Sequence, residues 1–248
     1  MKQLLTLMAM MCALVATAAH GDSGLVTELD VDHVDISANF AGEHVMIFGA
    51  VSRPGDVIIK VVSPPETIDL AHKAKFGPFW LTAGKARVEK TPGLLYVLSN
   101  KPVDQLLDKN ERDRYGLDLA DSLTDAKVTG KVDAADGWQD AFMHLKQQNG
   151  YYIQDGAAVK LVSNQLFSAT MKLPAKLPLG TYRLEIYRVR AGQVRGHQEQ
   201  TFDVREVKLE RWVSDAAYTH PITFGVLFTL LALTIGLVLG IALRKGDR

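Results

Sequence analysis

The chain has 248 residues, with 28 acidic and 28 basic side chains and a formal net charge of zero. Proteins that bind nucleic acid through its phosphates need an excess of basic residues, so this balance argues against a nucleic-acid partner. The single cysteine, Cys12, lies in the leading apolar segment. If that segment is removed, the mature chain has no disulfide, no thiolate metal site and no cysteine nucleophile.

The first 18 residues have the pattern of a secretory signal peptide. Lys2 provides the positive charge, residues 4–15 are apolar, and Ala16-Thr17-Ala18 matches an A-x-A cleavage site. We therefore predict a signal peptide over residues 1–18 and a mature chain that starts at Ala19. An uncleaved signal anchor is the alternative, and it would leave the following residues on the same side of the membrane.

Two stretches of the exported part have the pattern of antiparallel β-sandwiches. Short runs of β-branched and apolar residues alternate with Pro and Gly turns over residues 25–103 and again over residues 151–205. We predict a mainly β fold with two antiparallel, Ig-like sandwich domains at residues 19–103 and 150–206. A helical connection is predicted between them, at residues 104–149.

Three further helical patterns surround the second strand-rich stretch. The connection is predicted to hold one helix that begins near Pro102 and ends at Gly116, and another that runs from about Asp136 to Gly150. In the second helix the apolar face is predicted from spacing, and it consists of Trp138, Ala141, Phe142 and Leu145. An amphipathic juxtamembrane helix is predicted at residues 207–220, with Trp212 and Tyr218 suited to a membrane interface.

Residues 222–243 contain no charged side chain and predict a membrane span. As a helix this segment would be about 33 Å long, enough to cross a hydrocarbon core of about 30 Å. We predict a transmembrane helix over residues 221–243, with Pro221 in its first turn, and a cytoplasmic tail over residues 244–248. The tail carries Arg244, Lys245 and Arg248, which the positive-inside rule places in the cytoplasm.

A stripe of small residues along this span predicts contact with another helix. Two of its members form a G-x-x-x-G motif, and small residues let helix backbones approach closely in lipid. The predicted partner is a membrane protein or a second copy of the chain; the alternative is that glycine is simply common in spans. The stripe consists of Gly225, Thr229, Ala232, Gly236 and Gly240.

An aromatic cluster in the first strand-rich stretch has two interpretations. Phe76, Phe79 and Trp80 surround a Gly-Pro pair. They either form an exposed recognition edge, since tryptophan is enriched at binding hot spots, or belong to an ordinary sandwich core.

Motifs that carry catalysis or bind cofactors do not occur in the sequence. There is no G-x-S-x-G, and Gly77 to Gly84-Lys85 fails as a P-loop because the spacing is six residues and Ala86 stands where Ser or Thr is required. No histidines have metal-site spacing, although His33 and His44 could meet across a predicted hairpin and form a weak metal site. We predict a protein that is not an enzyme and has no cofactor and no metal.

Several stretches resemble an alphaproteobacterial family of transmembrane proteins with one C-terminal span. They are DISANFAGEHVMIFGAV (35–51), GPFWLT (77–82), AFMHLKQQNGYY (141–152), LFSATMKLPAKLPLGTYRLEIY (166–187) and the span itself. In GPFWLT the family more often has Gly-Ile-Trp, so this chain departs there. The family carries no established activity. Its genes are reported near permeases of the sulfite-exporter type, and the resemblance therefore implies an accessory role in transport.

Together these patterns predict a single-pass protein of the bacterial inner membrane, with a periplasmic ectodomain and a cytoplasmic C-terminus. We expect a non-enzymatic accessory or interaction protein of an inner-membrane system, with a sulfite-exporter-type permease as the candidate system. We also expect the protein to contact the lipid bilayer. The alternative is a periplasmic ligand-binding module.

Overall fold

The computed structural model describes residues 24–37, 39–130, 137–207, 213 and 217–245. The predicted signal peptide and most of the predicted juxtamembrane helix lie outside these residues. Strand accounts for 49% and helix for 26%, so the mainly β class is confirmed. The chain divides into a larger unit, Met1–Val34 with Ala41–Val204, and a smaller unit, Asp35–Phe40 with Arg205–Arg248.

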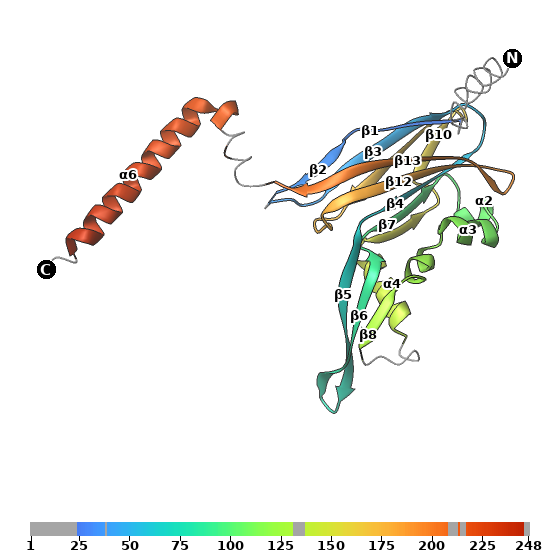
Figure 1. The fold of residues 1–248 in the computed structure, drawn as a ribbon, viewed down its shortest axis with the longest axis horizontal. Coiled ribbons are helices and arrows are strands. Elements are labelled where there is room, and N and C mark those ends of the chain that lie inside the picture. Colours follow the sequence, from blue (N-terminus) through green and yellow to red (C-terminus); the bar gives the residue numbers. More distant parts are fainter. Residues whose placement is uncertain (1–23, 38, 131–136, 208–212, 214–216, 246–248) are drawn as a thin grey trace, which may run out of the picture. The chain divides into compact units, whose positions relative to one another are not determined.

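Two sheets make up most of the larger unit, and we call them the two-sheet body (Figure 1). One has the strand order β1-β3-β11-β10 and the other β2-β13-β12-β4-β7-β9. The strands are β1 (Leu25–Leu29), β2 (His33–Ile36), β3 (Glu43–Val51), β4 (Asp56–Val62), β7 (Leu95–Ser99), β9 (Tyr152–Asp155), β10 (Val159–Val162), β11 (Leu166–Leu173), β12 (Gly180–Arg190) and β13 (Gln193–Glu206).

Strands from both predicted sandwich domains pair within these same sheets. Strand β3 pairs with β11 from Glu43↔Leu173 to Ala50↔Leu166, and β4 pairs with β12 from Asp56↔Val189 to Val62↔Arg183. The prediction of two separate Ig-like sandwiches is therefore not confirmed. Each half supplies strands whose backbone hydrogen bonds are completed only by the other half.

One pair of strands departs from the predicted antiparallel pattern. Strand β9 runs parallel to β7, in register from Leu95↔Tyr152 to Leu98↔Asp155. Parallel neighbours need a long crossover connection, and the segment between Ser99 and Tyr152 provides it. Strands β2 and β3 lie in different sheets, because β2 pairs with β13 whereas β3 pairs with β1 and β11. The predicted hairpin that would bring His33 and His44 together therefore does not form.

Hydrogen bonds connect the two sheets across their facing sides. The Tyr96 hydroxyl on β7 shares its one hydrogen between the carbonyl oxygens of Lys172 on β11, at 2.8 Å, and of Gly150, at 2.9 Å. The Gln200 amide on β13 donates to the Thr27 carbonyl oxygen on β1, at 2.6 Å. Because Tyr96 is 1% exposed, water cannot replace its hydrogen bonds.

Short helices cover the other face of the six-stranded sheet. They are α2 (Val103–Leu106), α3 (Lys109–Tyr115), the 3₁₀ helix η1 (Leu119–Leu123) and α4 (Trp138–Gln148). One buried cluster joins strand residues such as Ile58 and Val97 to Leu117 and Phe142. The single helix predicted before Gly116 is two helices, because Leu107 is extended and Asp108 caps α3 by accepting from Glu111 N. The predicted stop is confirmed: Gly116 ends α3 in the left-handed conformation, with φ of 58°.

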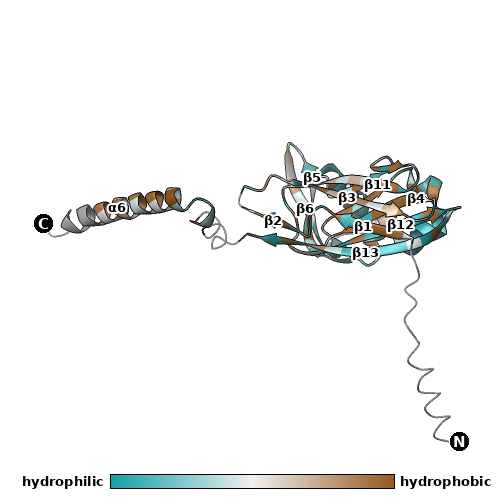
Figure 2. Cartoon of the chain, turned by 90° about the horizontal axis from the view of Figure 1, so that it is seen from above, coloured by the Kyte–Doolittle hydropathy of each residue, from teal (hydrophilic) through white to brown (hydrophobic). Residues whose placement is uncertain are grey.

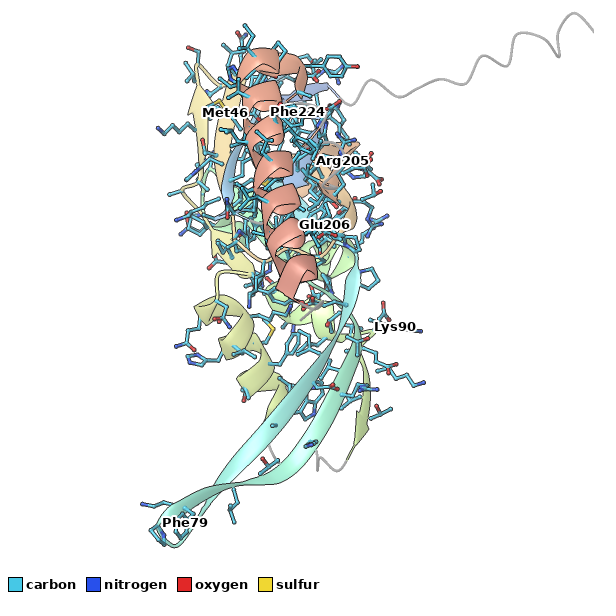
Figure 3. All side chains as sticks on the ribbon, turned by 90° about the vertical axis from the view of Figure 1, so that its left-hand side faces the viewer. Met46, Phe79, Lys90, Arg205, Glu206 and Phe224 are labelled. Carbon is cyan, nitrogen blue, oxygen red and sulfur yellow. The ribbon has the colours of Figure 1, made fainter. Side chains whose placement is uncertain are left out.

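A long two-stranded ribbon extends from the two-sheet body (Figures 1 and 3). Its strands are β5 (Pro65–Phe76) and β6 (Phe79–Pro92), joined by a turn at Gly77-Pro78. A third strand, β8 (Lys127–Gly130), pairs with β6 only from Ala86 to Glu89. The sequence predicted short separate strands here, and it placed β8 within a helical connection.

The smaller unit contains the predicted span. Helix α6 (Pro221–Lys245) begins at Pro221, as predicted. Its stretch Pro221–Leu239 has a mean hydropathy of 2.5 and contains no residue that is buried against the rest of the chain (Figure 2). Its threonine hydroxyls donate hydrogen bonds to backbone carbonyl oxygens one turn earlier. For example, Thr229 donates to Gly225 O at 2.8 Å. In the same unit Arg205 Nε lies 2.7 Å from Asp35 Oδ1.

Removing the Tyr96 hydroxyl tests the connection between the two sheets. Tyr96→Phe keeps the ring but leaves the carbonyl oxygens of Lys172 and Gly150 without this donor, so we expect a loss of about 1–2 kcal/mol in the free energy of unfolding. Urea denaturation of the chain in detergent micelles measures it. Tyr218→Phe, at a side chain 85% exposed, is the control and should change nothing. Equal stability of the two variants would contradict the proposed role of Tyr96.

Candidate functional site

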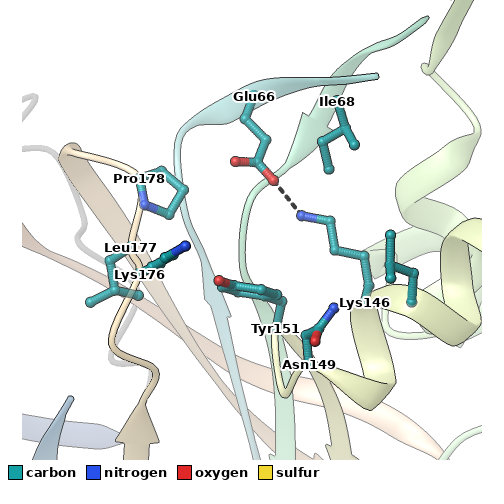
Figure 4. Close-up of a pocket in the computed structure, with 9 residues that line it drawn as sticks. Glu66, Ile68, Lys146, Asn149, Tyr151, Lys176, Leu177 and Pro178 are labelled. Atoms are coloured by element: carbon teal, nitrogen blue, oxygen red, sulfur yellow. Dashed lines mark hydrogen bonds and ion pairs between the residues drawn. The ribbon is translucent and has the colours of Figure 1, made fainter. Parts of the chain in front are cut away.

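A cavity of about 340 Å³ lies where helix α4, the base of β5 and the loop before β12 meet (Figure 4). The lining includes both acidic and basic side chains, and apolar side chains form the rest of the wall. The lining consists of Glu66, Ile68, Leu145, Lys146, Asn149, Tyr151, Lys176, Leu177 and Pro178.

Lys146 reaches this cavity from the buried face of α4. Phe142, one turn earlier, is fully buried, and Lys146 at i+4 follows it into the interior with only 3% exposure. The predicted apolar face is partly wrong, because Ala141 is exposed and Leu145 is 40% exposed. The buried face instead combines Phe142 and Lys146 with the partly buried Trp138.

The Lys146 ammonium is enclosed by one carboxylate, one carbonyl and three aromatic rings. It forms an ion pair with Glu66 and donates to Gly93 O at 2.8 Å. Its Nζ lies 5.2 Å from the ring centroid of Tyr151, 5.4 Å from that of Tyr152 and 5.7 Å from that of Phe142. These distances are within the range of cation–π attraction, which offsets part of the cost of removing a charge from water.

Burial lowers the pKa of Lys146 below its ordinary value, and the hydrogen bond and charge of Glu66 oppose that shift. Burial also raises the pKa of Tyr151, and the negative charge of Glu66 adds to the effect. A buried lysine with a lowered pKa at the wall of a cavity marks a candidate binding site.

The lack of a side chain at Gly93 allows a close backbone approach next to the site. A Cβ placed there would lie 2.2 Å from Cγ of Pro178, so only glycine lets the backbone pass beneath the loop before β12. This close approach brings the Gly93 carbonyl oxygen to Lys146. Sequence reasoning missed the site, although Lys146 stands one helical turn from Phe142 and shortly before the pair Tyr151-Tyr152.

The predicted aromatic recognition residues lie at the tip of the β5–β6 ribbon. Phe76 pairs with Phe79 and Lys75 with Trp80 across the turn, and Gly77 there has a φ of 60°. The side chain of Phe79 is 67% exposed (Figure 3), and that of Leu81 is 54% exposed. Phe79 is therefore not part of a core, which favours the interpretation of this tip as an exposed edge.

The predicted helix-packing residues all lie on α6. A Cβ added at Gly225 or Gly236 would meet no atom within 4 Å. At these two glycines the helix surface therefore leaves room for the close approach of another helix. Contact with a partner there stays a prediction.

One acidic group among the described residues has the spacing of metal ligands, and it has a structural role. The carboxylates of Asp113, Asp118 and Asp121 lie within 4.8 Å of one another. Asp118 and Asp121 form the capping box of η1, and Asp118 also lies 3.4 Å from Arg112. These contacts give Asp118 and Asp121 a structural role.

A family model described as "Putative transmembrane protein (Alph_Pro_TM)" matches residues 24–245. The chain belongs to this family. With α6 as its candidate span, it is a membrane protein with one apolar helix near its C-terminus. A comparison with curated proteins gives no match.

Breaking the ion pair at the cavity tests how strongly Lys146 depends on Glu66. Glu66→Gln leaves a buried ammonium without its counter-charge, so we expect a loss of about 2–4 kcal/mol in the free energy of unfolding. The double variant Glu66→Gln/Lys146→Met removes both charges and should be closer to the unmodified chain. Urea denaturation measures both variants. A double variant that is less stable than Glu66→Gln alone would contradict this account.

Proposed function

We propose that this protein is anchored in the bacterial inner membrane by α6 and carries the two-sheet body in the periplasm. The support is the predicted signal peptide, the family match and the basic residues Arg244, Lys245 and Arg248 after the span. Residues 1–18 direct export in this proposal, and the C-terminus stays in the cytoplasm.

In this proposal the protein acts without catalysis, as an accessory or interaction protein of an inner-membrane system. The observation that carries it is the tip of the β5–β6 ribbon. Between Phe79 and Lys85, on the side of Ala86 that leads to the tip, no third strand pairs with β6 among the described residues. The outer part of the ribbon is therefore only two strands wide. An isolated ribbon that exposes Phe79 and Leu81 to water gains stability when a partner covers them.

The charges of the tip indicate the chemistry of that partner. The segment from Leu70 to Val88 contains no acidic residue. It does contain the basic residues Lys73, Lys75 and Lys85. Arg87, nearer the base, is paired with Asp69, with Nε 2.8 Å from Oδ1. A partner surface that combines acidic and apolar side chains would therefore fit the tip. The small-residue stripe of α6 offers a second contact inside the membrane.

The ribbon tip should be required for capture of the partner, and a sulfite-exporter-type permease is the first to test. The full-length chain, produced with that permease and captured in detergent, should recover it. Phe79→Ser/Leu81→Ser removes the apolar contact and should lower recovery at least fivefold.

Val26→Ser/Val162→Ser is the matched control, because it removes two exposed apolar side chains from the four-stranded sheet instead. Recovery with this control should equal that of the unmodified chain. Failure to recover the permease with the unmodified chain, or an equal loss in both variants, would contradict the proposal.

A second candidate function is a periplasmic ligand-binding module. The observation that favours it is the Lys146 cavity, because a buried charge, a tyrosine hydroxyl and apolar side chains converge there.

A further inference from the structure

The polar ends of four side chains point toward the same space in the Lys146 cavity. Figure 4 shows Glu66, Lys146, Tyr151 and Lys176 arranged around it, from three separate segments of the chain. The volume of about 340 Å³ is at the lower end of the range for small-molecule sites. The site therefore suits a small ligand.

Two groups on the outer side of the cavity can receive an anion. Lys176 is exposed and forms no ion pair within the described part of the chain. The Tyr151 hydroxyl has no hydrogen-bond partner among those residues either, and it can donate. Since the lining contains two lysines and one glutamate, its net charge is positive and favours a ligand that presents a carboxylate.

The Lys146–Glu66 pair retains hydrogen-bonding capacity toward a ligand. An ammonium has three donors, and Glu66 and Gly93 O occupy two of those of Lys146. Glu66 bonds Lys146 through Oε1, so its other oxygen can accept from a ligand. Its side chain is 32% exposed, which leaves that oxygen within reach.

We propose that this cavity binds a small carboxylic acid that carries a hydroxyl or amino group next to the carboxylate. The carboxylate lies against Lys176 and the Tyr151 hydroxyl, and the neighbouring group donates to Glu66. A short aliphatic side chain packs on the apolar wall of Ile68, Leu145, Leu177 and Pro178. The proposal rests on the second candidate function and assigns its ligand class.

Titration calorimetry of the full-length chain in detergent tests this ligand class. The probes are L-2-hydroxyisocaproate and L-leucine, which share the carboxylate and the aliphatic body and differ in the donor. At least one should bind. The matched compounds 4-methylpentanoate, which lacks the donor, and 2-hydroxyisocaproamide, which lacks the carboxylate, should bind at least tenfold more weakly. Absence of binding by both probes, or equal binding of the matched compounds, would overturn the proposal.

Variants locate the binding at this cavity. Lys176→Ala and Tyr151→Phe should each weaken the better probe at least fivefold, while Lys160→Ala, an exposed lysine on β10 outside the cavity, should not. Unchanged binding in the first two variants would overturn the assignment. Lys176→Ala should still capture the permease as the unmodified chain does, so failure of the ligand proposal is distinguishable from failure of the interaction proposal.

Discussion

The pairing of β3 with β11 and of β4 with β12 is the constraint on which the rest of the larger unit depends. These strands are separated by more than a hundred residues of sequence, yet they complete each other's backbone hydrogen bonds. Closing such a long loop is entropically costly, and burial of apolar side chains on both faces of β4 offsets that cost. The ribbon and the helices between β4 and β11 are therefore held at both ends by the two-sheet body.

The segment between β4 and β11 provides the ribbon tip and most of the lining of the Lys146 cavity, and the loop between β11 and β12 adds Lys176, Leu177 and Pro178. Its helices cover the six-stranded sheet, its first two strands form the ribbon, and the Lys146 cavity lies where helix α4 meets the base of that ribbon. A contact made at the ribbon tip is thus separate from a ligand held at the base. The same body can support an interaction surface and a small-molecule site without either occupying the other's residues.

Local patterns in the sequence predicted elements well but predicted their partners poorly. The start of the span helix at Pro221 and the helix stop at Gly116 both follow from short-range chemistry, and the structure has them. Strand pairing depends on long-range packing, because alternation of apolar residues specifies a face and not a neighbour. Lys146 was missed for a related reason: a lysine on a helix is normally solvated, and its burial here depends on groups distant in sequence, namely Glu66 and the carbonyl oxygen of Gly93.

An engineered disulfide between β3 and β11 tests the central claim, that both halves of the chain form one two-sheet body. Met46 and Thr170 are directly paired and both exposed, so Met46→Cys/Thr170→Cys in a Cys12→Ser background should cross-link on mild oxidation. The account predicts nearly complete loss of free thiol in this variant and little in Met46→Cys/Ala169→Cys, where position 169 is buried on the opposite face. Free thiols that persist in the first variant, or equal cross-linking in both, would contradict it.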